Sequence, residues 1–302
     1  MNKEIRKIIN VANIHPISYE KKGKIYIISD KKKTYVIKLN TNNSDIYKYL
    51  LSRDFLFFPE MLSLKNSNYD MYEYIPEIKE DKEQKIEDLI VIIAKLHNKT
   101  SYLREIDLDE IKSIYESIKK EIDKTKDFYI KINDLIDKEV FLSPPEYLLI
   151  RNISLIYYAL NLANNYIDDW YRTIINEKSI RVSLLHNNIS IEHLIINEDK
   201  YLISWDKAYF DNPIYDIEGI YRKYYASIEF ANALRIYEKN NKLNCLEYKL
   251  LVARLLIPKI IYFSSNTLQD TEEINEEISF LNKIVTFIKK DKIREEEKLS
   301  KN

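Results

Sequence analysis

Residues 184–217 read LLHNNISIEHLIINEDKYLISWDKAYFDNPIYDI, and this stretch decides how the chain folds. Two apolar segments, 190–197 and 201–205, flank the polar tip Glu198-Asp199-Lys200, which predicts a β-hairpin with a charged turn. Polar residues precede and follow this hairpin: His186, Asn187 and Asn188 before it, and Asp206, Asp211, Asn212 and Asp216 after it. A buried hairpin with solvated ends explains this pattern, and so does a rigid scaffold that presents a site on its loops.

The same stretch resembles the catalytic core of aminoglycoside phosphotransferases and choline-kinase-like proteins. The pattern of that group runs H-G-D-x-x-x-x-N, a hairpin, I-D-W/F, and then a G-D-P-x-x-D-L tail. The chain keeps this frame at several positions: His186, Trp205, Pro213 and Asp216. It departs from the frame where the chemistry is carried, with Asn188 in place of the first Asp, His193 in place of Asn, and Ser204 in place of the second Asp.

In the family, these three positions serve phosphoryl transfer, which needs Mg²⁺ ligands and an Asp that accepts the hydroxyl proton. The neutral amide of Asn188 can orient a hydroxyl but cannot take its proton near pH 7. Ser204 offers Mg²⁺ only an uncharged hydroxyl, and the imidazole of His193 suits zinc or iron better. The resemblance therefore implies degenerate catalytic motifs, in which His186 and Asp216 keep the role of loop scaffold.

Neighbouring carboxylates could replace the missing ones. Asp206 lies two residues beyond Ser204, on the same side of a predicted extended strand, and Glu192 directly precedes His193. We favour loss of catalysis over such a replacement, because losing a proton acceptor alone costs roughly 10²–10⁴-fold in rate. His186 and His193, with one of these carboxylates, also suggest a transition-metal site, but a structural role that orients the loop explains the two imidazoles better.

Composition excludes several other classes of protein. The chain has 302 residues, 47 Lys+Arg against 48 Asp+Glu and a net charge of −1, so we expect no nucleic-acid partner. Its only glycines are Gly23 and Gly219, too few for a Walker A loop, a Rossmann fingerprint or a protein-kinase glycine loop. The lone Cys245 excludes an internal disulfide, and no long uncharged apolar run or signal peptide is present, which predicts a cytoplasmic protein without a membrane partner.

The fold class that these patterns predict is α+β, a two-lobed protein-kinase-like fold. Residues 1–75 should form a small antiparallel β lobe, with a helix at 3–12, a three-stranded meander at 17–40, a helix at 43–53 and strands at 55–64 and 69–75. Residues 76–302 should form a larger helical lobe that contains the hairpin stretch 184–217. Its predicted helices span 86–100, 108–137, 147–172, 221–237, 246–263 with a break at Pro258, and 273–290.

The kinase-like layout also implies a nucleotide site in the small lobe. Val36-Ile37-Lys38 resembles the strand whose lysine holds the phosphates, and Asp45 is the one candidate on the following helix for an acidic partner of Lys38. Glu73 and Tyr74 lie in a strand that resembles the hinge, whose backbone would meet an adenine. An ordinary edge strand that Pro76 ends explains this last segment equally well.

Within the superfamily, the segments 94–100 and 236–244 resemble the bacterial spore-coat kinase-like branch. This implies a catalytically impaired pseudokinase with a binding or scaffold role, no cofactor, and an unidentified protein partner such as a spore-coat component. The alternative is an active ATP- and Mg²⁺-dependent phosphotransferase that acts on a small-molecule hydroxyl through a rearranged metal site. In a third hypothesis, tyrosines and other side chains fill the cleft.

Overall fold

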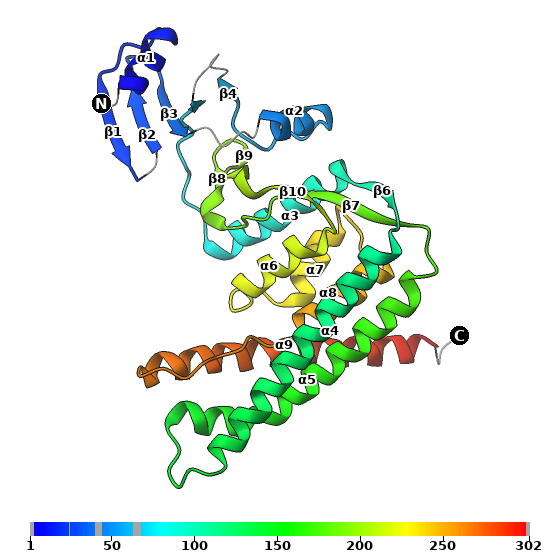
Figure 1. Ribbon diagram of the computed structural model, residues 1–302. Helices are drawn as coiled ribbons and strands as arrows, with labels where there is room; N and C mark the ends of the chain where they lie inside the picture. The colour runs from blue at the N-terminus through cyan, green and yellow to red at the C-terminus, as the bar shows by residue number, and fades with distance from the viewer. Residues whose placement is uncertain (1–2, 24, 40–43, 63–67, 300–302) are drawn as a thin grey trace. The chain divides into compact units, whose positions relative to one another are not determined.

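The computed structural model of this protein describes residues 3–23, 25–39, 44–62 and 68–299 (Figure 1). The chain divides into two compact units, which we call unit 1 (Met1–Thr100 with His186–Tyr209) and unit 2 (Ser101–Leu185 with Phe210–Asn302). This grouping differs from the lobes predicted at 1–75 and 76–302. Residues 186–209 belong to unit 1, where two backbone bonds connect them to the first hundred residues: Leu202 N–H donates to Phe57 C=O at 2.7 Å, and Ile78 N–H donates to Ile196 C=O at 2.8 Å.

Unit 1 is built on an antiparallel sheet of five strands in the order β1-β2-β3-β5-β4 (Figure 1). The predicted meander is confirmed as β1 (Ser18–Lys22), β2 (Ile25–Ser29) and β3 (Thr34–Leu39), and β5 (Tyr69–Glu73) is also where we predicted it. The strand predicted at 55–64 shrinks to β4 (Met61–Leu62), since Pro59 lacks the N–H that a ladder needs. The end of that prediction lies outside the described residues.

The two faces of this sheet have different neighbours. The amphipathic helix α1 (Lys3–Val11) packs Ile5, Ile8 and Ile9 into a core cluster with Ile28 of β2 and Ile37 of β3. Because side chains alternate along a strand, the residues next to Ile37 point to the other face. That face carries the candidate site described below.

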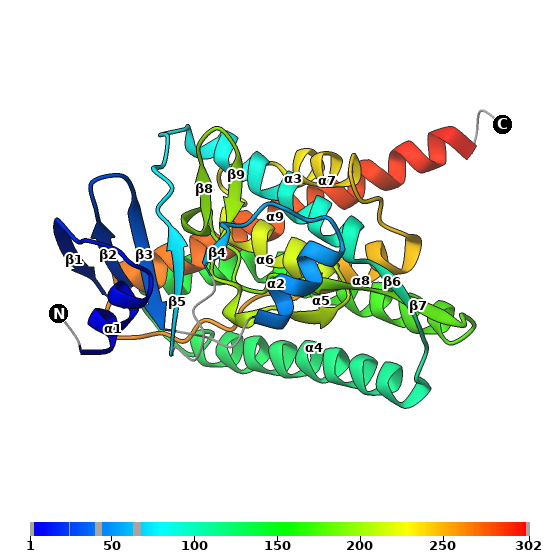
Figure 2. The ribbon, with the colours of Figure 1, turned by 90° about the horizontal axis from the view of Figure 1, so that it is seen from above.

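Helices and the hairpin complete unit 1. The helix predicted at 43–53 is α2 (Ser44–Ser52), and the one predicted at 86–100 is α3 (Lys82–Thr100), which begins four residues earlier. The predicted hairpin is confirmed as β8 (Leu194–Ile196) and β9 (Lys200–Leu202), which lie side by side near α3 (Figure 2). An ion pair between Lys200 and the buried carboxylate of Asp88 on α3 anchors the hairpin.

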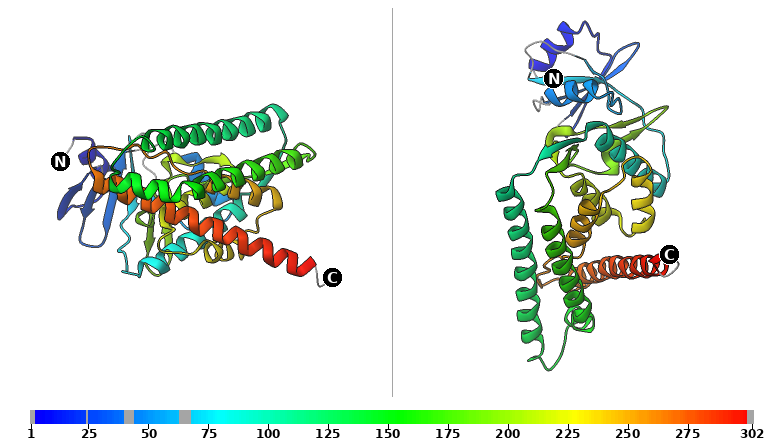
Figure 3. Two further views of the ribbon diagram at one scale, coloured as in Figure 1. Left: turned by 90° about the horizontal axis from the view of Figure 1, so that it is seen from below. Right: turned by 90° about the vertical axis from the view of Figure 1, so that its right-hand side faces the viewer.

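Unit 2 is mostly helical. In Figure 3, α4 (Leu108–Ile136) and α5 (Pro144–Ile174) run side by side, and α5 also packs against α8 (Cys245–Leu255) and α9 (Thr267–Leu299). A small sheet has the order β10-β7-β6, and α6 and α7 complete the unit. The remaining bounds are β6 (Tyr102–Glu105), β7 (Ser179–Leu185), β10 (Tyr209–Asp211), α6 (Ile214–Tyr224) and α7 (Phe230–Glu238). No helix in the described ranges is long and apolar enough to cross a bilayer.

Two helix predictions in this unit are wrong in extent. The single helix predicted at 221–237 is divided into α6 and α7, because the chain turns between them and buries Ile228 and Phe230. The helix predicted at 246–263 ends at Leu255, and the chain does not become helical again before Thr267. Pro258 explains this end, since its ring fills the place of a backbone donor and clashes with the preceding turn.

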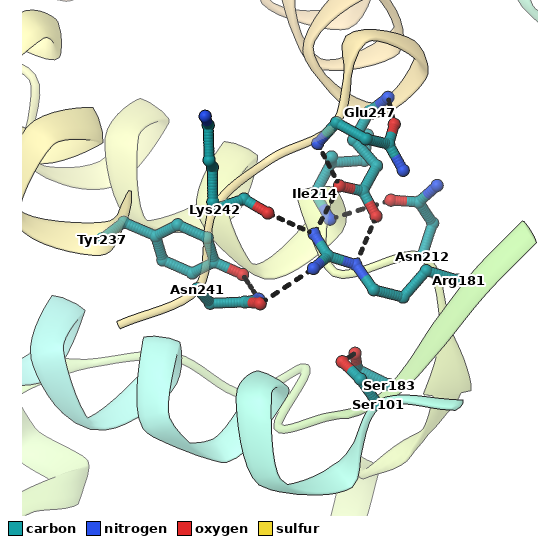
Figure 4. Close-up of polar contacts among 10 residues, drawn as sticks. Ser101, Arg181, Ser183, Asn212, Ile214, Tyr237, Asn241, Lys242 and Glu247 are labelled. Carbon is teal, nitrogen blue, oxygen red and sulfur yellow. Dashed lines mark hydrogen bonds and ion pairs between the residues drawn. The ribbon is translucent and has the colours of Figure 1, made fainter. Parts of the chain in front are cut away.

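An ionic network around the buried carboxylate of Glu247 joins β7 to α8 and to the residues just before it (Figure 4). Arg181 donates from Nε to Glu247 Oε1 at 2.7 Å, from Nη1 to Asn241 Oδ1 at 3.0 Å and from Nη2 to Lys242 C=O at 2.9 Å. A further contact joins Nη2 to Glu247 Oε2. Asn241 in turn donates to the hydroxyl of Tyr237 at 2.6 Å. These bonds fix β7, the strand that leads along the chain into the loop at 186–188.

Candidate functional site

Unit 1 contains a cavity of about 220 Å³ on the sheet face opposite α1. Its walls come from the sheet, from the segment after β5 and from the hairpin stretch, and most of them are apolar. The lining residues are Ile25, Ile27, Val36, Lys38, Tyr47, Pro59, Tyr72, Glu73, Tyr74, Ile75, Ile195, Ile203 and Ser204. A concave apolar pocket with a few convergent polar groups is the usual form of a small-molecule site. This one is smaller than the roughly 300–1,000 Å³ that enclose drug-sized ligands.

Lys38 places a cation in this cavity. It lies on β3 directly opposite Asp70 of β5, and its Nζ lies 5.3 Å from the centroid of the Tyr72 ring. Burial lowers the pKa of Lys38, while the negative charges of Asp70 and Asp206 act in the opposite direction. The ammonium therefore has two carboxylates and an aromatic face as neighbours.

Two tyrosines line the cavity beside Lys38. The hydroxyl of Tyr72 donates to the hydroxyl of Tyr47, with the two oxygens 3.4 Å apart. Burial raises the pKa of Tyr47 to about 12, and it raises the pKa of Tyr72 well above the usual range. Both side chains are neutral phenols at physiological pH and can offer hydrogen bonds to a ligand without adding charge.

The acidic partner predicted for Lys38 lies elsewhere. Asp45 is an exposed residue in the first turn of α2, and its Oδ1 pairs with Lys48 Nζ at 3.1 Å. Sequence reasoning missed Asp70, which is buried on β5. The available signal was the alternation along β5, which puts residue 70 on the same face as Tyr72.

The predicted hinge residues are partly engaged in the sheet itself. Glu73 Oε2 accepts from Lys33 Nζ at 2.7 Å, and both side chains are about half exposed. The backbone N–H of Tyr74 donates to Thr34 C=O at 2.8 Å, which continues the β3–β5 ladder beyond the end of β5. That amide is therefore already used, although Glu73 and Tyr74 both line the cavity.

The loop before the hairpin is held by its two histidines. The ring of His186 is fully buried, and its Nε2 lies 2.9 Å from Ile203 C=O. The Nδ1 of His193 lies 2.6 Å from the backbone carbonyl of Asn188. Since a carbonyl can only accept, His186 Nε2 and His193 Nδ1 each carry a proton and donate. The edge of His186 also meets Trp205, with ring centroids 4.8 Å apart.

Two residues of the stretch 184–217 adopt left-handed backbone conformations. Asn187, at the position of the family's glycine, has φ 51°, and Asn is the residue other than glycine that tolerates this region best. Its side-chain amide donates to Lys207 C=O at 3.2 Å. Ser204 has φ 69°, and its carbonyl accepts a hydrogen bond from the side-chain amide of Asn188 at 3.3 Å.

The residues predicted for a metal site are Ser204, His193 and Asp206, with Glu192 as a candidate substitute ligand. In the described ranges, no group of three or more His, Cys, Asp or Glu is arranged to hold a metal ion. We predicted that Asp206 lies on the same face of an extended strand as Ser204. This is wrong, because the chain is not extended there: Trp205–Lys207 forms a 3₁₀ turn after the left-handed Ser204. Glu192 is engaged with Ser190, whose hydroxyl lies 3.5 Å from its carboxylate and accepts its backbone N–H at 3.3 Å.

Residues 211–217, which match the tail of the family's pattern, belong to unit 2. Asp216 is buried in the first turn of α6. Asn212 Oδ1 accepts the N–H of Ile214 at 3.2 Å, and Asp211 Oδ1 accepts the N–H of Asn212 at 2.6 Å. Burial raises the pKa of Asp211, and these bonds together form the turn that starts α6.

Comparison with known proteins shows the fold class. No protein-family model matches the chain, and no curated protein matches it in sequence. Its structure is similar to an aminoglycoside phosphotransferase from Alicyclobacillus acidocaldarius, with a TM-score of 0.63 and 12% identity over 92% of this chain and 95% of that one.

It is also similar to spectinomycin phosphotransferase APH(9)-Ia. For the complex with ADP and spectinomycin the TM-score is 0.51, with 13% identity over 92% of this chain and 98% of that one. For the AMP-bound complex the TM-score is 0.53, with 12% identity over 91% and 97%. The chain thus has the α+β kinase-like fold of these phosphotransferases, and the predicted fold class is confirmed.

Proposed function

We propose that this chain is a pseudokinase, which binds a small ligand in the unit 1 cavity and does not transfer a phosphoryl group. The hydrogen bond from the Asn188 side-chain amide to Ser204 C=O, at 3.3 Å, carries the proposal. The bond brings the two motif positions together, and the side chains at these positions, an amide and a hydroxyl, are both uncharged. Neither residue then supplies the charge that phosphoryl transfer needs.

The arrangement around Lys38 supports the same conclusion. Lys38 has Asp70, Asp206 and the ring of Tyr72 as its neighbours. Its predicted partner Asp45 pairs with Lys48 instead. The acidic residues beside Lys38 therefore differ from the one that the resemblance implied.

The biological role that fits a pseudokinase is binding or scaffolding. The sequence resemblance to the spore-coat kinase-like branch supports a cytoplasmic or spore-coat location and a protein partner such as a spore-coat component. The spectinomycin phosphotransferase structures contain ADP or AMP, which makes adenine compounds the first ligands to test for the cavity.

The test combines binding with turnover. A ligand that binds only the folded protein raises its melting temperature, so adenine compounds should do so, and EDTA should leave the shift unchanged. ATP consumption with Mg²⁺ should not exceed that of the buffer. Mg²⁺-dependent consumption that Lys38→Met abolishes would refute the proposal.

One observation favours a second candidate, an active small-molecule phosphotransferase with a rearranged site. The charge of Asp206 acts on Lys38, so a carboxylate is present near the lysine even though Ser204 has replaced the usual one. Under this hypothesis Asp206→Asn would abolish ATP turnover. Calorimetry that detects no ATP binding with either Mg²⁺ or Mn²⁺ would exclude it.

A further inference from the structure

A groove of about 690 Å³ runs along one side of α4 in unit 2, where the segment that follows α8 faces the helix. On α4 the lining extends from residue 115 to residue 131, which is about 24 Å of helix at 1.5 Å per residue. The lining residues are Tyr115, Glu116, Lys119, Lys120, Asp123, Lys124, Asp127, Phe128, Lys131, Ile260 and Tyr262. A groove of this length suits an elongated partner such as a helix better than a compact small molecule.

Six exposed charged residues form a stripe along this groove. Their signs alternate strictly along the chain, beginning with a negative charge and ending with a positive one: Glu116, Lys120, Asp123, Lys124, Asp127 and Lys131. Glu116 lies 3.8 Å from Lys112, and the other five form no ion pair with any residue of the described ranges. The stripe therefore presents six charges of which five are not neutralised by a close neighbour.

Pairing within α4 does not account for this order of charges. Lys120 and Lys124 are four residues apart and carry like charges, and so do Asp123 and Asp127. Like charges at this spacing destabilise an isolated helix. Opposite charges three residues apart, such as Lys120 and Asp123, form no ion pair in the described structure either. A partner outside the chain explains the order better than the helix itself does.

The stripe is complementary to a second copy of itself that runs in the opposite direction. Two α4 helices can be placed antiparallel about a twofold axis that passes between positions 123 and 124, and such an axis presents the same patch from both copies. The residues that then face each other are Glu116 and Lys131, Lys120 and Asp127, and Asp123 and Lys124. Every charge of the stripe meets an opposite charge, whereas a parallel arrangement in register would oppose each charge to its own kind.

Apolar side chains beside the stripe would add hydrophobic burial to this contact. Tyr262 is 68% exposed and lies against Phe128, with ring centroids 5.0 Å apart. In the antiparallel arrangement Phe128 faces Lys119 of the other copy, so the Tyr262 ring comes close to the end of that groove which Tyr115 lines. Exposed ion pairs alone contribute little to affinity, and buried aromatic rings contribute more.

We propose that this face of α4 is an interface between two copies of the chain, which pair antiparallel through the charged stripe. The interface lies wholly in unit 2 and uses no residue of the unit 1 cavity. It is therefore independent of ligand binding and of phosphoryl transfer.

Sedimentation velocity on the full chain tests the proposal. The native chain should show a monomer–dimer equilibrium, with a dimer fraction that rises with protein concentration and falls at high salt. Lys120→Glu should raise the dimer dissociation constant about tenfold or more, because it faces Asp127 of the other copy with a like charge. The matched control is Lys126→Glu, the same change at an exposed position of α4 outside the groove, which should leave the constant unchanged. A native chain that stays monomeric overturns the proposal, and so does a Lys120→Glu variant that dimerises as the native chain does.

Exchanging the two charges tests the antiparallel pairing itself. Asp127→Lys should weaken the dimer as Lys120→Glu does, because it faces Lys120 of the other copy. An equimolar mixture of these two variants should form a heterodimer, and the double variant Lys120→Glu/Asp127→Lys should dimerise again, since opposite charges meet in both cases. Failure of either to recover the dimer overturns the pairing. If circular dichroism shows that one of these variants does not fold, Glu116→Lys with Lys131→Glu provides the same exchange with the same outcomes.

Discussion

Replacing Arg181 by Met should destabilise unit 2 strongly, because it would leave a buried carboxylate without its partner. In the native chain the Arg181 guanidinium binds both oxygens of Glu247, and the side chain of Glu247 is only 3% exposed. Methionine fills much of the same volume but donates no hydrogen bond. Breaking a buried ion pair by removing one partner costs about 3–5 kcal/mol in free energy of unfolding.

The chain offers a matched control in the same unit. Arg104 also binds both oxygens of a glutamate, Glu110, at 2.8 Å each, but these side chains are 43% and 41% exposed. Exposed pairs of this kind contribute about 0–1 kcal/mol. Arg104→Met removes the same groups, so the difference between the two variants measures the effect of burial.

Tryptophan fluorescence can report on each unit by itself. Of the two tryptophans, Trp170 is buried on α5 in unit 2 and Trp205 is buried in unit 1. In a Trp205→Phe background, urea unfolding followed at Trp170 should show a loss of about 3–5 kcal/mol for Arg181→Met and less than about 1 kcal/mol for Arg104→Met. Equal losses in the two variants would refute the reasoning about the buried network.

Three further variants test unit 1. Burial lowers the pKa of Lys38, so the folded protein holds this proton less tightly than the unfolded chain. The melting temperature of the native chain should therefore rise relative to that of Lys38→Met as the pH increases from 7 toward the usual lysine pKa. Lys200→Met, which strands the buried Asp88, should cost several times more stability in urea than Lys48→Met, which removes an exposed pair. Asn187→Val should cost about 1–2 kcal/mol relative to Asn187→Gly, because only the latter fits φ 51°; equal stabilities would show that the left-handed backbone carries no strain.

The sequence predicts the parts of this fold whose signals are local. The β1–β3 meander and the β8–β9 hairpin follow from alternating residues and polar turns, and α4 follows from its 3.6-residue period. The pairing of β6 with β7 could not be predicted in this way. It joins Tyr102 to Val182, which are eighty positions apart in the sequence, and the short strands have no pattern that specifies their partner.

In the candidate site, too, the sequence predicts what depends on local signals and misses what depends on the pairing of distant segments. Lys38 was predicted from its place in the meander, and it does line the cavity. The importance of Asp70 depends on the register between β3 and β5, which the sequence does not specify. The error about Asp206 has a backbone cause, since the left-handed Ser204 ends the extended stretch and begins a 3₁₀ turn.

The central claim is that the kinase-like fold is kept while phosphoryl transfer is lost. The most direct measurement is ATP consumption by the native chain in Mg²⁺, beside the double variant Asn188→Asp/Ser204→Asp, in which Asp tolerates the left-handed backbone at position 204. We predict no Mg²⁺-dependent turnover by the native chain. Turnover by the native chain that requires Mg²⁺ and disappears in Lys38→Met would contradict the claim.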